Sequence, residues 1–239
     1  MKRDHRPYFI KKADQRFQDF YVKHFLRPQL ESLGTGFAFR KPWHVEIFGP
    51  RIELGNYVNV IATSDKKVRL AVWPESEGKG CIRVGNYCLI CPGVRIGSAS
   101  KIIIGDNCMI AGHSYITDSD WHDIYNRVSS GKTAPVIIKD NVWIADSAII
   151  CKGVTIGENS IIGAGSVVVN DIEPNIIAAG NPAGEVKRLD PKEPTTTRAH
   201  WFSDPVRLYK GFDMVDRDTL RENTVLHWLR SMLFPVKED

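Results

Sequence analysis

The chain has 239 residues, 43% of them hydrophobic, and a formal net charge of +4, which fits one globular domain with appendages. So mild a charge does not favour a nucleic-acid partner, and no apolar run approaches the roughly 18 residues of a membrane-spanning helix. The charged N-terminal segment is unlike a signal peptide and the five cysteines form no disulfide framework, so we expect a cytoplasmic protein with reduced thiols.

The first 45 residues are basic, with ten Lys or Arg against four Asp or Glu. We interpret this charge as a solvated helix face rather than as a contact with an anionic membrane surface, which the charge alone would also permit. Aromatic residues at helical spacing, from Phe17 to Phe25, stop before Pro28. They predict an amphipathic helix over residues 11–27 that covers the open first coil of the repeat region.

An apolar residue recurs at every sixth position, in interrupted blocks, from about residue 48 to residue 172. Neither an α-helix, with period 3.6, nor a half-buried strand, with period 2, produces this spacing. A triangular column does, if each of its three flat faces takes six residues and every sixth side chain points to the axis. The pattern predicts a mainly β protein, a parallel β-helix of about five coils, rather than a sandwich of separate strands. The repeating residues include Phe48, Leu54, Val60, Val84, Ile90, Ile96, Ile104, Ile110, Ile116, Ile138, Ile144, Ile150, Ile156, Ile162 and Val168. Small or aliphatic residues stand four positions after the last six: Val142, Ala148, Val154, Ser160, Ser166 and Ile172.

Two insertions interrupt the repeat. Residues 66–83 hold Val68, Leu70 and Val72 in alternation before a turn-rich PESEGKG segment, which predicts a protruding hairpin. Residues 117–135 must leave the column as an arm. Insertions of this kind often line the working site of a solenoid, so the arm is where we expect the chemistry.

Cys88 and Cys91 form a C-x-x-C pair inside a repeat. No second pair and no histidine partner accompanies them, as a zinc site would require. We interpret both as packing residues.

After the repeats, residues 190–204 form a polar, Pro-containing connector. Thr219 and Glu222 then have the spacing of a helix capping box, and leucines at helical spacing continue to Pro235. The sequence therefore predicts three parts: a helical cap over residues 1–45, a β-helix over residues 46–189, and a connector with a C-terminal helix over residues 190–239.

Four short segments give the repeat region a family resemblance. They are residues 118–122 (DSDWH), 141–145 (NVWIA), 162–166 (IGAGS) and 179–183 (AGNPA). Over roughly residues 46–190 the chain resembles the hexapeptide-repeat acyltransferase superfamily, in its maltose/galactoside O-acetyltransferase-like branch. The resemblance implies a left-handed parallel β-helix, a homotrimer, and acetyl-CoA as co-substrate in a cleft between neighbouring columns. Neither the hand nor the trimer follows from the periodicity.

A general base is the first requirement for acetyl transfer to a hydroxyl, and a neutral imidazole suits this role because its ordinary pKa is about 6.5. The resemblance assigns the base to His122 in the arm. Asp118 or Asp120 could orient its ring or hold an acceptor hydroxyl. His113 is the competing candidate: it should point outward near the same cleft, where it could contact the acceptor or itself be the base.

For the acetyl-CoA donor, the resemblance implies a path along the last two coils. Small residues there let a narrow pantetheine arm approach the backbone, and a lysine can meet phosphates. The mechanism requires no metal. The residues implied for the donor are Asp146, Ala164, Val169, Asn170 and Lys187.

These observations favour an O-acetyltransferase that acts on a hydroxyl of a sugar or glycan precursor. Transfer to an amine stays open. Two other classes compete with an acyltransferase. One is a catalytically silent β-helix scaffold. The other is a γ-type carbonic anhydrase-like zinc enzyme, which needs three histidines; His113 and His122 have no third partner in the repeats.

Overall fold

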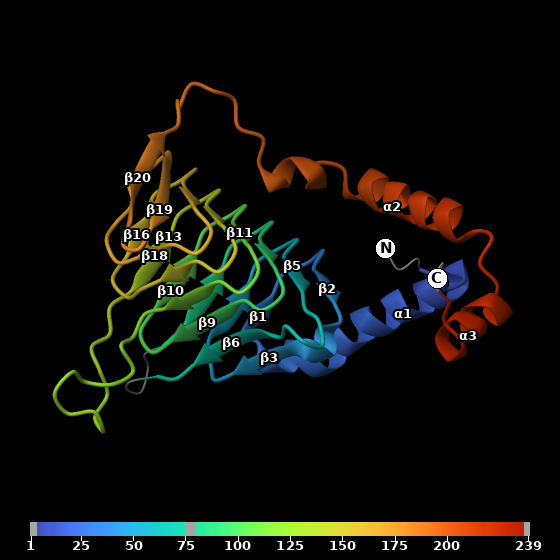
Figure 1. Cartoon of the computed structure of the whole chain (residues 1–239), viewed down its shortest axis with the longest axis horizontal. Helices are drawn as coiled ribbons and strands as arrows, with labels where there is room; N and C mark the ends of the chain where they lie inside the picture. Colours follow the sequence, from blue (N-terminus) through green and yellow to red (C-terminus); the bar gives the residue numbers. More distant parts are fainter. Residues whose placement is uncertain (1–3, 75–79, 237–239) are drawn as a thin grey trace.

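The repeat region is a column of three parallel β-sheets that share one core (Figure 1). The computed structural model describes residues 4–74 and 80–236. Successive strands pass from the first sheet to the second and the third and back again, so three strands make one coil. The first sheet contains β1 (Ser32–Leu33), β4 (Ile52–Leu54), β7 (Ile82–Val84), β10 (Ile102–Ile104), β13 (Val136–Ile138) and β16 (Thr155–Ile156). The second contains β2 (Ala38–Arg40), β5 (Asn59–Ile61), β8 (Leu89–Ile90), β11 (Met109–Ile110), β14 (Trp143–Ile144), β17 (Ile161–Ile162), β19 (Ile176–Gly180) and the antiparallel β20 (Ala183–Arg188). The third contains β3 (Val45–Phe48), β6 (Val68–Val72), β9 (Arg95–Ser98), β12 (Tyr115–Thr117), β15 (Ile149–Ile150) and β18 (Val167–Val168).

The sixfold repeat builds the core as predicted. Ile104, Ile138 and Ile156 occupy matching positions on neighbouring strands of the first sheet, and each is at most 2% exposed. Burying one such side chain contributes about 1.5–3 kcal/mol. The residues four positions later fill the corners, and all six that we singled out are buried.

Asparagines at left-handed backbone positions form a ladder along one corner. Asn141, Asn159 and Asn175 have φ of 57° to 60°. The Asn141 side chain donates to Asn159 at 2.9 Å, and Asn159 donates to Asn175 at 3.1 Å. These side chains therefore link the last three turns of this corner, in addition to the strand pairing.

The column is longer than the sequence predicts. The first and third sheets have six strands each among the described residues, not about five. The additional coil begins at Ser32, upstream of residue 46, because β1 and β2 pair with β4 and β5. The inward residues of this coil, Leu33, Phe39 and Val45, are also six residues apart. Nine residues separate Val45 from Leu54, so this triplet is out of phase with the block that follows, and we did not include it in the predicted repeat.

Two predictions near the start of the column are wrong. Phe48 does not point inward: it is 51% exposed and stacks on Trp73 at 4.2 Å, while Val45 takes the buried position on the same strand. Residues 68–72 do not form a hairpin. They are β6, which lies between β3 and β9 in the third sheet. Buried and more exposed side chains alternate along these residues as on the other strands of the column. Residues 75–79 of the expected hairpin lie outside the described residues.

An N-terminal helix covers the first coil. α1 (Tyr8–Tyr21) continues through a π-helical segment, Val22–Leu26, into a 3₁₀ turn, Arg27–Gln29. Val22 and Leu26 join the core cluster. A second 3₁₀ turn, Pro42–His44, leads into β3. The helix therefore closes the end of the column that would otherwise expose apolar side chains.

The C-terminal segment folds back along α1 (Figure 1). A 3₁₀ turn (Arg198–Phe202) precedes α2 (Pro205–Leu220) and α3 (Val225–Leu233). The predicted helix start at Thr219 is wrong, because Thr219 lies in the last turn of α2. Thr224 caps α3 instead, by accepting a hydrogen bond from the backbone of His227 at 3.2 Å.

Candidate active site

The arm is anchored to the column by a buried carboxylate. Asp118, at the base of the arm, is fully buried. It accepts hydrogen bonds from the Ser98 hydroxyl at 2.7 Å and from the backbone amides of Ala99, Ser100 and Lys101 at 2.7, 2.9 and 2.5 Å. The four donors satisfy this carboxylate inside the protein. Asp118 therefore holds the arm in place. Its buried carboxylate is not accessible to a substrate in this chain, so it does not have the role in acceptor binding that we expected.

The base of the arm is a short, ordered hairpin, and the rest of the arm projects from the column (Figure 1). Ser119 forms an antiparallel bridge with Thr133, and the Asp120 amide donates to the Lys132 carbonyl at 3.0 Å. Asp120 also pairs with Lys152 of the following coil at 2.9 Å. The arm therefore leaves the column in a fixed direction.

His122 stands just beyond this ordered base. Its backbone amide donates to the Asp120 carbonyl at 2.7 Å, and its side chain is exposed. The preceding Trp121 donates through its indole N–H to the Tyr115 hydroxyl at 3.1 Å, on the outer face of the third sheet. The backbone at His122 is thus held near the column, and its exposed imidazole is accessible to a reactant.

His113 lies at another corner, where the second sheet turns into the third. We call this the His113 corner; it comprises residues 91–94, 111–114, 145–148 and 163–166. His113 Nδ1 is 3.5 Å from Asp146 Oδ2. The pKa of Asp146 lies below its ordinary range, mainly because of the hydrogen bond from the Ser147 hydroxyl. The neighbouring His113 lowers it further. The pair is half-exposed and could bind a hydroxyl or share a proton.

The turns of the His113 corner stack with little space between them. Amides donate to carbonyls of neighbouring turns, from His113 to Pro92 at 3.1 Å and from Gly165 to Asp146 at 2.9 Å. A Cβ added at Gly93 would approach His113 Cδ2 to 2.8 Å. Ala164 belongs to the same stack and is exposed. Because it lies between Gly163 and Gly165, no large side chain covers its backbone.

The remaining donor residues lie elsewhere. Val169 and Asn170 follow β18 where the third sheet returns to the first. This is the corner from which the arm departs, and we call it the arm corner; it comprises residues 118–135, 151–154 and 169–171. Lys187 is exposed on β20, beyond both corners. Within one chain, therefore, the expected residues do not converge. His113, Asp146 and Ala164 line one edge of the third sheet, and the His122 arm, Val169 and Asn170 line the other.

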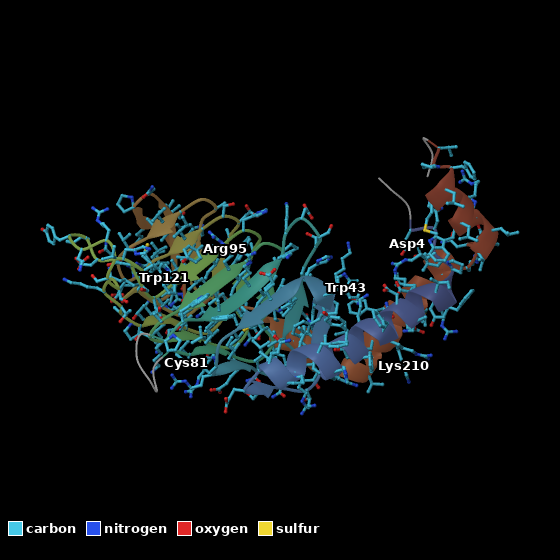
Figure 2. All side chains as sticks on the ribbon, turned by 90° about the horizontal axis from the view of Figure 1, so that it is seen from below. Asp4, Trp43, Cys81, Arg95, Trp121 and Lys210 are labelled. Carbon is cyan, nitrogen blue, oxygen red and sulfur yellow. The ribbon has the colours of Figure 1, made fainter. Side chains whose placement is uncertain are left out.

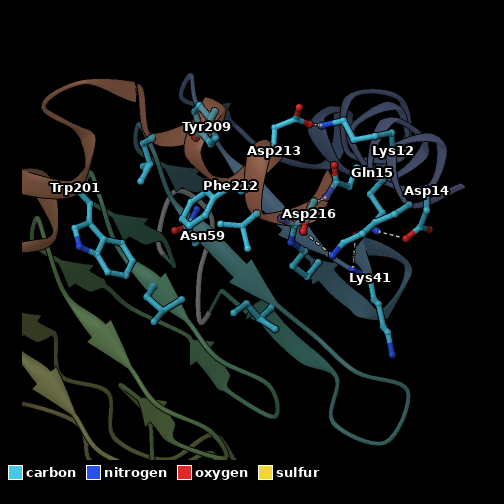
Figure 3. Close-up of a pocket in the computed structure, with 18 of the residues that line it drawn as sticks. Lys12, Asp14, Gln15, Lys41, Asn59, Trp201, Tyr209, Phe212, Asp213 and Asp216 are labelled. Carbon is cyan, nitrogen blue, oxygen red and sulfur yellow. Dashed lines mark hydrogen bonds and ion pairs between the residues drawn. The ribbon is translucent and has the colours of Figure 1, made fainter. Parts of the chain in front are cut away.

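A cavity of about 890 Å³ lies between the helices and the second sheet (Figure 3). Trp201, Phe202 and Phe212 contribute to its lining, together with ion pairs that join α1 to α2. The helices are at the opposite end of the molecule from the arm (Figure 1). The cavity holds neither histidine candidate, so it is not where we locate the transfer chemistry.

Sequence reasoning missed two residues that order these regions. Lys152 positions the arm through Asp120, and nothing in its repeat position signals this. Arg198, in the polar connector, donates to the Tyr87 carbonyl and to Asn59 Oδ1, both at 2.7 Å. Burial lowers the pKa of Arg198. Both interactions join segments far apart in sequence, which a local pattern does not report.

The five cysteines are free thiols. Hydrogen bonding with Cys108 and burial raise the pKa of Cys88 well above its ordinary range, and burial raises that of Cys91. Neither favours a reactive thiolate. Across residues 4–74 and 80–236, no three His, Cys, Asp or Glu side chains gather in a way that could hold a metal ion, and no helix is long and apolar enough to cross a membrane.

Comparison with known proteins confirms the resemblance. Residues 135–170 match the family described as bacterial transferase hexapeptide (six repeats). The chain is 45% identical over 100 residues to the Saccharomyces cerevisiae protein named "Putative acetyltransferase YJL218W", covering 41% of this chain and 51% of that protein. It is 36% identical over 105 residues to galactoside O-acetyltransferase of Escherichia coli, covering 43% and 50%. The chain thus spans about half the length of these curated relatives.

A solved structure extends the likeness to most of the fold. It is a point mutant of AntD, an N-acyltransferase from Bacillus cereus, in complex with dTDP and coenzyme A. The two chains are 22% identical, with a TM-score of 0.58 over 81% of this chain and 95% of that one. At this identity the likeness shows a shared fold.

Proposed function

We propose that this protein is an acyltransferase that moves the acetyl group of acetyl-CoA to a hydroxyl of a sugar or glycan precursor. The observation that carries the proposal is the arm: the buried Asp118 fixes its base while the His122 imidazole stays exposed beside the column. The relatives named as acetyltransferases support the same reaction class.

In the proposed reaction, His122 removes the proton from the acceptor hydroxyl as its oxygen attacks the thioester carbonyl. The new C–O bond forms and the C–S bond breaks. The proton then passes from the imidazolium to the departing sulfur, which leaves as the thiol of CoA. Backbone amides at a column interface stabilise the oxyanion that develops on the carbonyl oxygen.

The separation of the candidate residues supports a site shared between copies. His122 belongs to the arm corner, whereas Asp146 and Ala164 belong to the His113 corner across the third sheet. A neighbouring column in a closed ring can bring the second corner of one copy to the arm of the next. We therefore include a homotrimer of left-handed β-helices in the proposal, with the donor in the cleft between columns.

The donor and acceptor roles are divided accordingly. Ala164 gives pantetheine a narrow backbone path, and Val169, Asn170 and Lys187 contact the rest of the donor. His113 with Asp146 contacts the acceptor or the donor at the cleft. Asp120 orients the arm through Lys152, and Asp118 is reassigned to anchoring the arm, since its carboxylate is already satisfied.

Release of free thiol from acetyl-CoA tests the reaction class. The purified protein is incubated with acetyl-CoA and a panel of hydroxyl and amino sugars, and thiol is followed with a chromogenic reagent. We expect acceptor-dependent release, with hydroxyl sugars preferred. A failure to release thiol with every acceptor in the panel would favour a silent scaffold. Zinc in a metal analysis together with CO₂ hydration would favour the carbonic anhydrase-like alternative.

A further inference from the structure

A hollow of about 280 Å³ lies on the outer face of the third sheet, beside the arm. Its floor is formed by Ala71 and Gly97, which are register partners on β6 and β9. Two such small residues leave an open space on a surface where other strands carry longer side chains. Ligand pockets commonly hold roughly 300–1,000 Å³, so this hollow suits about one ring of a ligand.

Aromatic rings bound the hollow. Trp73 is 54% exposed and stacks on Phe48 at 4.2 Å, so the Phe48 ring that points away from the core supports it. Trp121 is fixed by its hydrogen bond to the Tyr115 hydroxyl. Aromatic rings present large, rigid, apolar faces with little conformational entropy to lose on binding. They suit the C–H face of a sugar ring.

Gly97 keeps the hollow open under Trp121. A Cβ at this position would lie 3.2 Å from Trp121 Cζ2, which is tighter than an ordinary van der Waals contact. The backbone conformation does not require glycine here, because Gly97 is a strand residue with no positive φ. Glycine is therefore needed at this position because it leaves the space that a side chain would fill.

Positive charge lines one side. Arg69 and Arg95 are direct partners on neighbouring parallel strands, an arrangement in which like charges repel. Glu46 pairs with Arg69 and also with Lys67 at 2.7 Å. Arg95 lies 4.5 Å from the centre of the Tyr115 ring and has no carboxylate partner among the described residues. An anion bound here would relieve the repulsion.

The hollow is placed to serve the proposed reaction. Trp121 immediately precedes His122, and Figure 2 shows Arg95 and Trp121 over the same part of the strands, away from Asp4, which precedes α1, and from Lys210 of α2. We propose that the hollow is an acceptor subsite for a sugar that carries an anionic group, either a carboxylate or a phosphate. The ring packs against Trp73 and Trp121, and Arg95 binds the anion through its guanidinium. This assignment rests on the proposed function.

Direct binding tests the subsite without requiring turnover. Glucuronic acid, glucose 1-phosphate and neutral glucose are titrated calorimetrically into the full chain at low salt. We expect both anionic sugars to bind at least about tenfold more tightly than glucose, and the tighter of the two identifies the acceptor's anionic group. Equal binding of all three probes, or no binding by any, would overturn the proposal.

Variants locate the binding. Arg95→Gln is expected to weaken the anionic probes about tenfold or more and to leave glucose unchanged. Arg83→Gln is the matched control: Arg83 belongs to the same coil but lies on the first sheet, paired with Glu53 at 2.8 Å. Gly97→Val should exclude all three probes by filling the hollow. Circular dichroism melting verifies that each variant is folded, and an Arg95→Gln protein that binds like the parent contradicts the assignment.

A further variant separates this proposal from the reaction. His122→Ala should retain the binding of the anionic sugar while losing transfer. If His122→Ala still transfers acetyl, the proposed base is wrong and the subsite stands on its binding data. If wild-type protein transfers acetyl only to neutral sugars and binds no anionic one, the reaction class stands and the subsite fails.

Discussion

The carboxylate of Asp120 in the arm lies 2.9 Å from the ammonium group of Lys152 on the next coil. This ion pair links the base of the arm to the coil that follows it. Asp120 lies two residues before His122, so the link is close to the proposed base. Both side chains are partly exposed, at 39% and 30%. Pairs of this kind contribute little to global stability, about 0–1 kcal/mol, so their role is better sought in the direction of the arm.

Lys152→Ala should therefore separate activity from stability. We expect kcat/KM for acetyl transfer to fall several-fold, because the arm loses one of its fixed contacts, while the melting temperature stays almost unchanged. Lys139→Ala, another exposed lysine of the repeat, serves as the control and should have neither effect. Wild-type kinetics in Lys152→Ala would show that the ion pair does not position the base.

Asp118→Asn should have the opposite profile. The amide nitrogen of asparagine would face some of the N–H and O–H donors that now point at the carboxylate, and a buried donor without an acceptor costs about 1–3 kcal/mol. Urea unfolding should show this loss, together with reduced activity. Asp140→Asn is the control, because the Asp140 carboxylate accepts one exposed backbone hydrogen bond, from Asp106 at 2.8 Å. If the two variants have equal stability, Asp118 is not an anchor.

Acid should loosen the contact between α1 and α2. Hydrogen bonds from Lys12, Tyr8 and Arg217 hold the pKa of Asp213 well below its ordinary range. A carboxyl with a depressed folded-state pKa stabilises the fold above the unfolded value, about 3.9, and loses this contribution as the pH falls below it. Exposure to solvent screens the interaction, so the effect should be modest.

The measurement is the urea midpoint between pH 7 and pH 2.5. Wild-type protein should lose stability below about pH 4, and Asp213→Asn should start lower at neutral pH and show a shallower decline. Parallel curves for the two proteins would mean that Asp213 does not contribute to the acid response.

The sequence predicted the core because the interior of the column is regular. A side chain that recurs at every sixth position must occupy matching places on successive coils, as Ile138 and Ile156 do. The same logic failed where the regularity stops. Leu33, Phe39 and Val45 of the first coil are six residues apart, but this triplet is out of phase with Leu54 and the block that follows. Phe48 kept the sixfold spacing to Leu54 by coincidence, while Val45 took the inward position.

The candidate site was predictable in its residues and not in its arrangement. The arm and the small residues of the last coils are local features of the sequence. Which of them share a corner depends on how the coils stack, and whether Asp118 faces a substrate or the backbone depends on four donors that lie 17 to 20 residues away. Arg95 and Trp121 were not predicted as partners for the same reason, since their shared hollow exists only on the folded sheet.

Subunit complementation tests the shared site most directly. His122→Ala removes the proposed base at the arm corner, and Ala164→Trp blocks the proposed donor path at the His113 corner; each protein alone should be folded, trimeric and inactive. When equal amounts are unfolded and refolded together, random trimers should regain acetyl transfer at about a quarter of the wild-type sites, those where an intact arm meets an intact donor corner. A mixture that stays as inactive as its two components would contradict a site made by neighbouring copies, and an active His122→Ala protein would contradict the base itself.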